Sequence, residues 1–419
     1  MKDRYELIIA GGGFAGTAAA ITAARRGVDV LLIEKYNALG GAAVSSLVMP
    51  FMSYWTHVPE TGEKAFLCGN LFREIVSRMD EMTSQTGELA QFDEEVLKLV
   101  LNRMAVQAGV TLLFDTTVTE AAVSGGRVTS VKVLGKSRTL SFYADTFIDA
   151  TGDAELAMLA GCSCKVGREK DGLCQPMTLC FRMSGVDKEK YLKNRANINA
   201  LYKEAKQKGK IKNPREDVLI FGNYNDGVLH FNSTRIVKRN PTDPFEVTKA
   251  EIEAREQVFE LLYFLKENIE GFENARVLST ALQIGIRESR KIEGEYTLTE
   301  ADLKSLARFP DAIAAANYDI DIHNPEGTGT THYYFGKGQW YEIPYRCLIP
   351  KHMDNLLVAG RCISSTHEAQ ASYRIMPFCA ELGQAAGTAA AVAVKDKTSV
   401  RNVDVQQVQS ILRDAGFVI

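Results

Sequence analysis

Residues 5–34 read YELIIAGGGFAGTAAAITAARRGVDVLLIE, and this stretch decides the fold. It opens with a short apolar strand over residues 5–10, turns on glycines, and continues as an alanine-rich helix over residues 14–26. Gly27 is placed to end that helix, and a second apolar strand follows over residues 28–33. Strands that are apolar on both faces are typical of parallel sheets covered by helices. The stretch therefore predicts a right-handed strand–helix–strand unit.

The glycines of the turn have the spacing G-x-G-x-x-G, at Gly11, Gly13 and Gly16. The first permits a tight turn, the second lets the backbone approach a pyrophosphate, and the third lets the helix pack closely on the strand. The N-terminus of the helix then offers free N–H groups and a positive dipole end to the phosphates. Glu34 ends the second strand, where an acidic side chain is expected on a ribose hydroxyl. Because its charge disfavours a 2′-phosphate, FAD or NAD is favoured over NADP.

The composition is that of a globular protein, with 419 residues, 46% hydrophobic and 24% charged residues, and a net charge of −3. This balance excludes a disordered chain and argues against a partner that is a nucleic acid, since such proteins normally carry a basic surface. We expect no membrane partner, because no apolar run approaches the roughly 20 residues of a membrane span. The start of the chain shows no signal peptide and the eight cysteines are scattered, so we expect free thiols and a cytoplasmic location.

The rest of the chain predicts an α/β fold with two structural units. Residues 1–165 add a helical stretch at 70–108 and several β-like segments to the first unit, which we expect to be a Rossmann-like domain, a parallel sheet with flanking helices. Residues 166–345 carry long Lys- and Glu-rich stretches between strand-like pieces, and predict an inserted α+β substrate or cap domain. Residues 346–419 contain another apolar strand, at 355–359, and a helix of small residues. We expect them to return to the first sheet, so that the nucleotide-binding domain is discontinuous.

Several segments match a known family in their residues: GGGFAG at 11–16 with Glu34 and Lys35, LGG at 39–41, IDATGD at 148–153, and NLLVAGR at 355–361 with GQAAG at 383–387. On these segments the chain resembles FAD-dependent oxidoreductases of the glutathione reductase superfamily, particularly the fumarate-reductase-like group. The stretches at 175–183 and 286–296 fit the subgroup known simply as FAD-dependent oxidoreductases. The resemblance implies a Rossmann-like FAD-binding domain, FAD as the cofactor, and oxidoreductase activity on a small-molecule substrate.

The resemblance also implies which residues contact FAD. They are Gly11, Gly13, Phe14, Ala15, Gly16, Glu34, Lys35, Gly40, Gly41, Val118, Ala150, Thr151, Gly152, Gly360, Arg361, Ile375, Met376 and Gly383. Some relatives attach FAD covalently through a His after the double glycine. Here Ala42 and Ala43 follow it, so we expect non-covalently bound FAD and no metal.

Two absences from the sequence narrow the reaction class. The disulfide reductases carry a second fingerprint for NAD(P)H and a C-x4-C motif after the first unit. This chain has one fingerprint, and residues 40–51 contain no cysteine. We therefore expect an external electron donor or acceptor, with no dithiol chemistry of that type.

The segment at 360–377 joins the returning strand to the last helix, and in the resembling families it lies against the flavin ring. Backbone N–H groups at its end would stabilise negative charge on the reduced ring. Within it, His367 is the candidate proton donor or acceptor, and Arg374 is the candidate anchor of a substrate carboxylate. The alternative for both side chains is that they brace the loop.

Arg287 and Arg290 form a further pair of cations, three residues apart and on one face if the segment is helical. They could bind an anion. A salt bridge with Glu288 or Glu293 is the interpretation that we favour at this point.

The sequence thus predicts a cytoplasmic FAD-dependent oxidoreductase that transfers a hydride or electrons between FAD and a small organic substrate bound between the two domains. An alternative is a flavin-bearing electron-transfer subunit of a larger redox complex. A flavin-dependent RNA-modifying enzyme is a third hypothesis, against which the net charge of −3 weighs. A homo-oligomer is compatible with all three.

Overall fold

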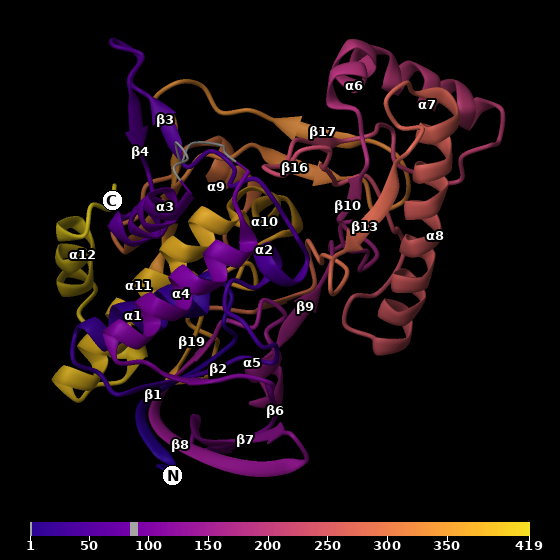
Figure 1. The fold of residues 1–419 in the computed structure, drawn as a ribbon. Helices are drawn as coiled ribbons and strands as arrows, with labels where there is room; N and C mark the ends of the chain where they lie inside the picture. The colour runs from indigo at the N-terminus through magenta and orange to yellow at the C-terminus, as the bar shows by residue number, and fades with distance from the viewer. Residues whose placement is uncertain (1, 84–90) are drawn as a thin grey trace.

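A seven-stranded sheet forms the centre of the computed structural model, which describes residues 2–83 and 91–419 (Figure 1). Its strands are β1 (Arg4–Ala10), β2 (Val30–Ile33), β5 (Thr111–Leu113), β6 (Thr116–Ser124), β7 (Arg127–Gly135), β8 (Arg138–Asp149) and β19 (Leu356–Val358). The strand order is β5-β2-β1-β8-β7-β6, and β19 pairs with the end of β8. Strands β5, β2, β1, β8 and β19 run parallel, and β7 is antiparallel to both β8 and β6.

The strand–helix–strand unit at the start of the chain is formed as predicted. Helix α1 (Phe14–Arg25) joins β1 to β2, and the two strands pair in parallel with Leu7 opposite Val30. All four residues of β2 are buried, because the sheet is covered on both faces there. The predicted fold class is confirmed: an α/β protein with a Rossmann-like parallel sheet and flanking helices.

The last part of the chain returns to this sheet. Strand β19 pairs in parallel with β8, with Leu357 opposite Ile148. Helix α11 (Met376–Asp396) then lies along α1 (Figure 1). A Cβ on Gly383 would lie 2.0 Å from the Ala15 carbonyl oxygen, so the two helix backbones touch where neither side chain intervenes. The central sheet is therefore assembled from the two ends of the chain.

Two further helices pack near α1, within the stretch that the sequence predicted to be helical. They are α3 (Asn70–Thr83) and α4 (Glu94–Ala108), and residues 84–90 lie outside the described residues. Asp93 starts α4 by accepting hydrogen bonds from the backbone N–H groups of its first turn. Gly109 ends it in the left-handed region, with φ of 88°.

A second hydrophobic core lies in a separate lobe, seen at the upper right of Figure 1. The lobe contains α6 (Lys188–Asn194), α7 (Ile198–Gln207) and α8 (Pro244–Asn268), with the strands β10 (Phe181–Ser184), β11 (Ile220–Phe221), β12 (Leu229–Phe231) and β13 (Arg276–Thr280). These strands form a four-stranded sheet in the order β11-β12-β10-β13. The lobe is thus an α+β unit inserted between parts of the first one.

The second core is built from a shorter range of residues than the range 166–345 expected for the inserted domain. Apart from Leu47, its buried apolar side chains come from residues 177–284. The strands β15 (Ala312–Ala316) and β18 (Tyr341–Pro344) pair with each other and pack in the first core instead. Their side chains are all buried, and β15 contacts α11.

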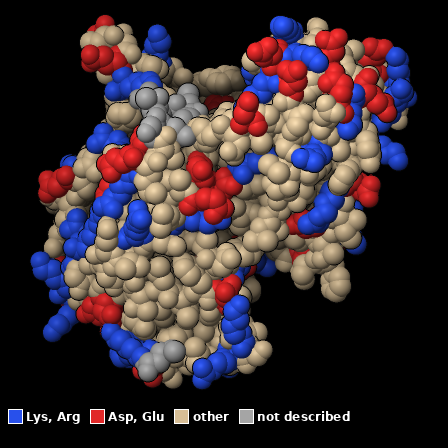
Figure 2. Space-filling model, in the orientation of Figure 1, with Lys and Arg blue, Asp and Glu red and all other residues tan. Residues whose placement is uncertain are grey.

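The surface mixes charges of both signs. Figure 2 shows basic and acidic side chains interspersed over both lobes on the face that it draws. Among residues 2–83 and 91–419, no helix is both long and apolar enough to cross a membrane.

Glu381 lies on the buried side of α11, where only 1% of its surface is exposed. Burial raises the pKa of its carboxyl well above the usual range, and the Ala315 backbone and the Cys68 thiol offset this only in part. A raised folded-state pKa means that stability should fall, by about 1.4 kcal/mol per pH unit, as the pH rises above the unfolded value of 4.5. The loss should continue until the folded carboxyl itself ionises. We expect Glu381→Gln to abolish it, as measured by thermal unfolding between about pH 4.5 and 8.

The control for this prediction is Glu60→Gln, since Glu60 is an exposed carboxylate. That variant should follow the wild-type pH dependence. A Glu381→Gln protein that is no more stable than the wild type at about pH 8 would contradict the account, because the charge penalty is largest there.

Candidate functional site

A cavity of about 530 Å³ extends along the junction of the two cores. Four parts of the chain line it: the glycine turn with the loop after β2, the loops after β8 and β19, the inner side of the second lobe, and the segment 318–332. The first two parts lie at the carboxyl ends of parallel strands, the edge at which open α/β sheets bind ligands.

The glycine turn supplies bare backbone to the cavity. The first intrahelical bond of α1 runs from Thr17 N–H to Gly13 O, so the N–H groups of residues 14–16 have no acceptor within the helix. The backbones of Gly13 and Gly41 lie against each other in the cavity wall, and a Cβ on Gly41 would lie 2.9 Å from the Gly13 Cα. Free N–H groups beside backbone that carries no side chain fit a pyrophosphate.

Glu34 stands at the edge of the same turn and is buried. Its Oε2 accepts the Gly12 N–H at 2.5 Å, and its Oε1 accepts the Tyr36 N–H at 2.9 Å. Burial raises the pKa of Glu34, while these backbone bonds and the charge of Lys35 oppose the rise. Each oxygen keeps another lone pair, and the side chain lines the cavity. Glu34 can therefore accept a hydrogen bond from a ribose hydroxyl.

The loops after β8 and β19 are joined by Arg361. Its Nε donates to Gly152 O at 2.7 Å, its Nη2 lies 2.6 Å from Asp153 Oδ1, and its Nη1 donates to Ile286 O. Burial opposes ionisation of Asp153, yet the charges of Arg361 and Lys35 hold its pKa below the usual range. Arg361 thus fixes three separate segments around the cavity.

Most of the residues predicted to contact the cofactor line this cavity: Gly11, Gly13, Phe14, Ala15, Glu34, Lys35, Gly40, Gly41, Ala150, Thr151, Gly152, Gly360, Arg361, Ile375 and Met376. Three others are placed elsewhere. Gly16 packs against the backbone of Gly11, Gly383 packs against Ala15, and Val118 lies in β6 opposite Val133. These three positions shape the supporting structure and do not line the cavity wall.

His367 is placed away from the cavity, which corrects the expectation that it faces a substrate. It is the first residue of α10 (His367–Tyr373), a helix capped by Thr366. Its side chain is 4% exposed, and its Nδ1 lies 2.6 Å from Glu288 Oε2. The other oxygen of Glu288 pairs with the buried Lys291. The start of α10 aims the ring at this buried cluster, so His367 positions Glu288.

Arg374 lines the cavity just after α10, as expected of an anchor. Its Nη2 lies 3.3 Å from Asp321 Oδ2, and its buried Nε has no hydrogen-bond partner among the described residues. His323 Nε2 also lies 3.3 Å from Asp321 Oδ2, and its Nδ1 accepts from Arg235 at 3.1 Å. Burial and the charge of Arg287 lower the pKa of His323 to about 3, so the ring is neutral with its proton on Nε2. Arg374 therefore shares the Asp321 carboxylate with a neutral histidine.

Arg287 lines the cavity without a carboxylate of its own. Its Nη1 donates to Pro176 O at 2.8 Å and to Thr178 Oγ1 at 2.5 Å. Among the ion pairs of the described residues, none includes Arg287. Burial, and then the neighbouring guanidinium of Arg374, lower the pKa of Arg287 to about 9. The site therefore holds a buried cation whose charge is incompletely balanced.

The salt bridge that the sequence favoured for Arg287 is not formed. Glu288 belongs to the buried cluster at the start of α10, and Glu293 lies 3.8 Å from Lys165. The segment is not helical, and the second arginine begins β14 (Arg290–Ile292), outside the cavity. The salt bridge predicted from the local sequence is wrong, because the chain turns between Arg287 and these two glutamates.

His332 lines the cavity from β17 (Thr330–Tyr333), which pairs with β16 (Ile320–His323). Its Nδ1 lies 2.5 Å from Asp319 Oδ2, and its Nε2 lies 3.8 Å from Asp321 Oδ1. Because a carboxylate accepts, Nδ1 donates to Asp319, and Nε2 makes no hydrogen bond among the described residues. Burial raises the pKa of Asp319, and the bond from His332 opposes that rise. A histidine oriented by a carboxylate is an arrangement suited to acid–base chemistry.

Sequence reasoning missed this hairpin and the polar contacts beside the glycine turn. Tyr36 donates its hydroxyl proton to Gln283, whose Nε2 donates to Ser45 Oγ at 2.9 Å. No local sequence pattern predicts that contact, since its partners are far apart in the sequence. The hairpin has a usable signal: residues 319–323 read DIDIH, with three titratable side chains at every second position and therefore on one face of a strand.

Comparisons with known proteins place the chain in a family. A family model described as FAD dependent oxidoreductase matches residues 6–412, nearly the whole chain. Among solved structures, a geranylgeranyl bacteriochlorophyll reductase-like protein from Thermoplasma acidophilum has a TM-score of 0.46 at 12% identity, over 98% of this chain and 84% of that one.

Several curated relatives match part of the chain. Digeranylgeranylglycerophospholipid reductase 1 from Methanococcoides burtonii is 27% identical over 197 residues, which cover 45% of this chain and 46% of that protein. Protein FixC from Azotobacter vinelandii is 27% identical over 175 residues, which cover 39% of this chain and 40% of the relative. The chain thus spans less than half the length of the curated relatives that it matches.

The family model and the geometry of the cavity point to one cofactor. The free N–H groups at the start of α1, the bare backbone at Gly13 and Gly41, and the cavity-facing carboxylate of Glu34 together fit a dinucleotide. The family model begins before these residues and ends after α11, so it includes every part of the cavity wall. The chain belongs to the FAD dependent oxidoreductase family.

Proposed function

We propose that this oxidoreductase acts on a small organic carboxylate, held by Arg287 and Arg374, which both line the cavity. Bound FAD supplies the hydride or electron transfer. The observation that carries the proposal is Arg287, a cavity-lining cation for which the described residues provide no carboxylate partner. A buried charge without a partner is costly, and an anionic substrate offsets that cost when it binds.

The two arginines would contribute differently to binding. Among the described residues, only Nη1 of Arg287 donates to the protein, so its Nε and Nη2 are available to a ligand. Arg374 is already held by Asp321, whose pKa stays below the usual range despite burial because His323 and the two arginines stabilise its charge. Arg287 is therefore the main carboxylate anchor, and the neighbouring Arg374 helps to orient the substrate.

His332 and Asp319 supply proton transfer in this proposal. His332 Nε2 makes no hydrogen bond among the described residues, although it lies 3.8 Å from Asp321 Oδ1, and the bond at Nδ1 fixes the orientation of the ring. The ring also stacks on Tyr334, with centroids 5.3 Å apart and planes 4° from parallel, which limits its rotation. Because His332 lines the cavity and His367 does not, the proton-transfer role that the sequence suggested for His367 passes to His332.

We further propose an external electron donor or acceptor, because the chain carries a single G-x-G-x-x-G fingerprint. All eight cysteines lie among the described residues and are free, which supports work in a reducing compartment, the cytoplasm. The motif spacing at both ends of the chain supports a place in the glutathione reductase superfamily.

The proposal is tested by anaerobic screening with matched pairs, each a carboxylic acid and its primary amide. The flavin absorbance band of the FAD-loaded protein reports reduction or reoxidation. We expect the acids to react and the amides, which have the same shape and no charge, to react at least about tenfold more slowly. Amides that react as fast as their acids throughout the screen would refute the carboxylate proposal.

Glu34→Gln should weaken FAD binding by about 10- to 100-fold, because a charge-assisted bond to the ribose is lost and the new amide meets two backbone donors. Equilibrium dialysis of FAD against the refolded apoprotein measures the change. The matched control is Glu6→Gln: Glu6 also accepts a backbone N–H, that of Asp29 at 2.8 Å, but it does not line the cavity. Unchanged affinity in Glu34→Gln would remove that residue from ribose binding.

A further inference from the structure

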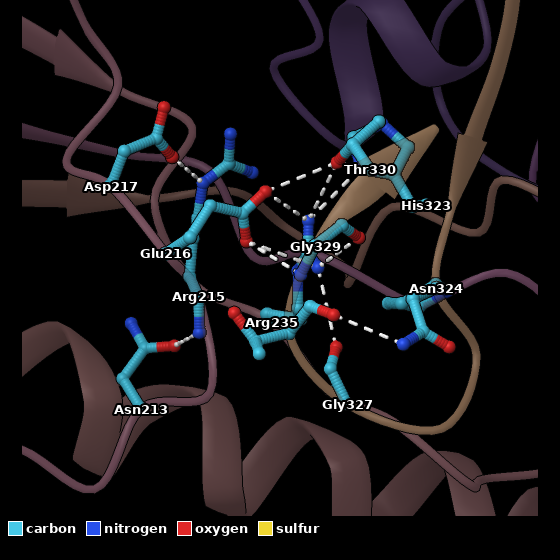
Figure 3. A network of polar contacts seen from close by, with 12 residues as sticks. Asn213, Arg215, Glu216, Asp217, Arg235, His323, Asn324, Gly327, Gly329 and Thr330 are labelled. Carbon is cyan, nitrogen blue, oxygen red and sulfur yellow. Dashed lines mark hydrogen bonds and ion pairs between the residues drawn. The ribbon is translucent and has the colours of Figure 1, made fainter. Parts of the chain in front are cut away.

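Arg215 is a second arginine of the cavity whose guanidinium is only partly hydrogen-bonded to the protein. Its side chain is 6% exposed, and it lines the cavity from the second lobe. Its Nε donates to Asp217 Oδ1 at 2.8 Å. Figure 3 shows the two terminal nitrogens of its guanidinium free of any drawn contact, and among the described residues no hydrogen bond to them is found.

The backbone around Arg215 is fixed, so the side chain is held in place. Its N–H donates to Asn213 Oδ1 at 3.0 Å, and its carbonyl oxygen accepts from Lys206 Nζ at 2.6 Å. Asn213 is in turn fully buried and bonded to the Ser233 carbonyl. Such support is typical of a side chain that is pre-organised for binding.

The neighbouring Arg235, in the same lobe, has the contacts of an arginine with a structural role. Its guanidinium is 1% exposed and contacts Glu216, His323, Thr330 and the carbonyl oxygens of the 327–329 turn (Figure 3). Arg235 does not line the cavity. Arg215, by contrast, has one acceptor, and its open edge consists of the two terminal nitrogens Nη1 and Nη2. This edge of a guanidinium can bind a carboxylate or phosphate through two parallel hydrogen bonds.

Arg215 is not part of the anchor formed by Arg287 and Arg374. It comes from the segment between α7 and β11, whereas the other two come from the segments before β14 and α11. All three line one continuous cavity. Their charges also influence one another, since Arg374 and then Arg215 add to burial in lowering the pKa of Arg287. A single carboxylate at Arg287 leaves the open edge of Arg215 without an acceptor.

We propose that the substrate carries two anionic groups, and that Arg215 binds the second one while Arg287 and Arg374 bind the first. This rests on the proposed carboxylate chemistry of the site and adds the class of substrate, an organic dianion. The second group is a carboxylate or a phosphate, both of which fit the open edge of the guanidinium. The cavity then selects its substrate by the distance between two charges.

The test compares acids of equal chain length that differ in their second charge. Isothermal titration calorimetry with the FAD-loaded protein measures the affinities of glutarate, adipate and pimelate against pentanoate, hexanoate and heptanoate. A third arm uses 5-phosphonopentanoate, which separates a phosphate-type from a carboxylate-type second group. We expect one dianion to bind about 10- to 100-fold more tightly than its monoanion.

Arg215→Met should remove this difference and leave the affinity of the monoanion unchanged. Asp217→Asn is the matched control: it takes the carboxylate from Nε but keeps the open edge, so the preference for the dianion should persist or grow. Equal binding of dianion and monoanion at every length would overturn the proposal, and so would an Arg215→Met protein that weakens both ligands alike. Failure of the carboxylate proposal looks different, because Arg287→Met would then leave the monoanion affinity unchanged.

Discussion

Arg287→Met should raise the KM for the substrate by about 100- to 1000-fold while the protein keeps its FAD. Losing one side of a buried charge pair costs about 2–5 kcal/mol. The effect should fall on affinity, because Arg287 binds a carboxylate that is charged before and during the reaction. Anaerobic stopped-flow measurement of the flavin band, over a range of substrate concentrations, separates KM from kcat.

The matched control is Arg290→Met, which removes a charge three residues away. Arg290 lies in β14, opposite Val166, and outside the cavity. Its kinetics should stay within about threefold of the wild type. Wild-type KM in Arg287→Met would contradict the assignment of that residue as the anchor.

His332→Ala should slow the substrate-dependent oxidation or reduction of the flavin by about 100- to 10,000-fold, the usual worth of a general acid or base. Reduction by dithionite should be unaffected, since it needs no proton-transfer group of the protein. Added imidazole should restore part of the rate, because the side chain of His332 is 34% exposed and its place is reachable from solvent. Asp319→Asn should show a smaller loss, because the ring remains but its tautomer is no longer fixed.

Comparison with His367→Ala decides between the two histidines. His367 is buried against Glu288. Its loss should therefore lower the unfolding temperature and have little effect on the rate of the flavin reaction. His352→Ala serves as the control, since His352 is exposed and remote from the cavity wall. A large rate loss in His367→Ala together with a normal rate in His332→Ala would overturn the structural assignment and restore the original interpretation of the sequence.

The cofactor end of the site could be predicted from sequence because local spacing determines it. The glycines of the turn, Glu34 and the segment at 150–152 are positioned by the strand ends that precede them, so their spacing along the chain fixes their place in space. Most of the residues expected at the cofactor line the cavity for this reason. Val118 shows the limit of this reasoning, since its strand lies at the edge of the sheet.

The substrate end could not be predicted because it depends on contacts between distant segments. Arg287 and Glu288 are neighbours in sequence, yet one lines the cavity and the other is buried at the start of α10. The direction of His367 follows from where α10 begins, which the sequence of the 360–377 segment leaves open. Arg215 lies in a stretch without a strand or helix of its own, and only the packing of the second lobe brings it to the cavity.

The return of the chain to its first sheet also fixes when the enzyme can acquire its cofactor. A ribosome releases β1 and β2 first and β19 and α11 last. Until residues beyond 355 emerge, Gly152 and Asp153 lack the clamp of Arg361, and the end of β8 keeps an open parallel edge. The complete cavity wall can therefore form only after β19 and Arg361 have been synthesised.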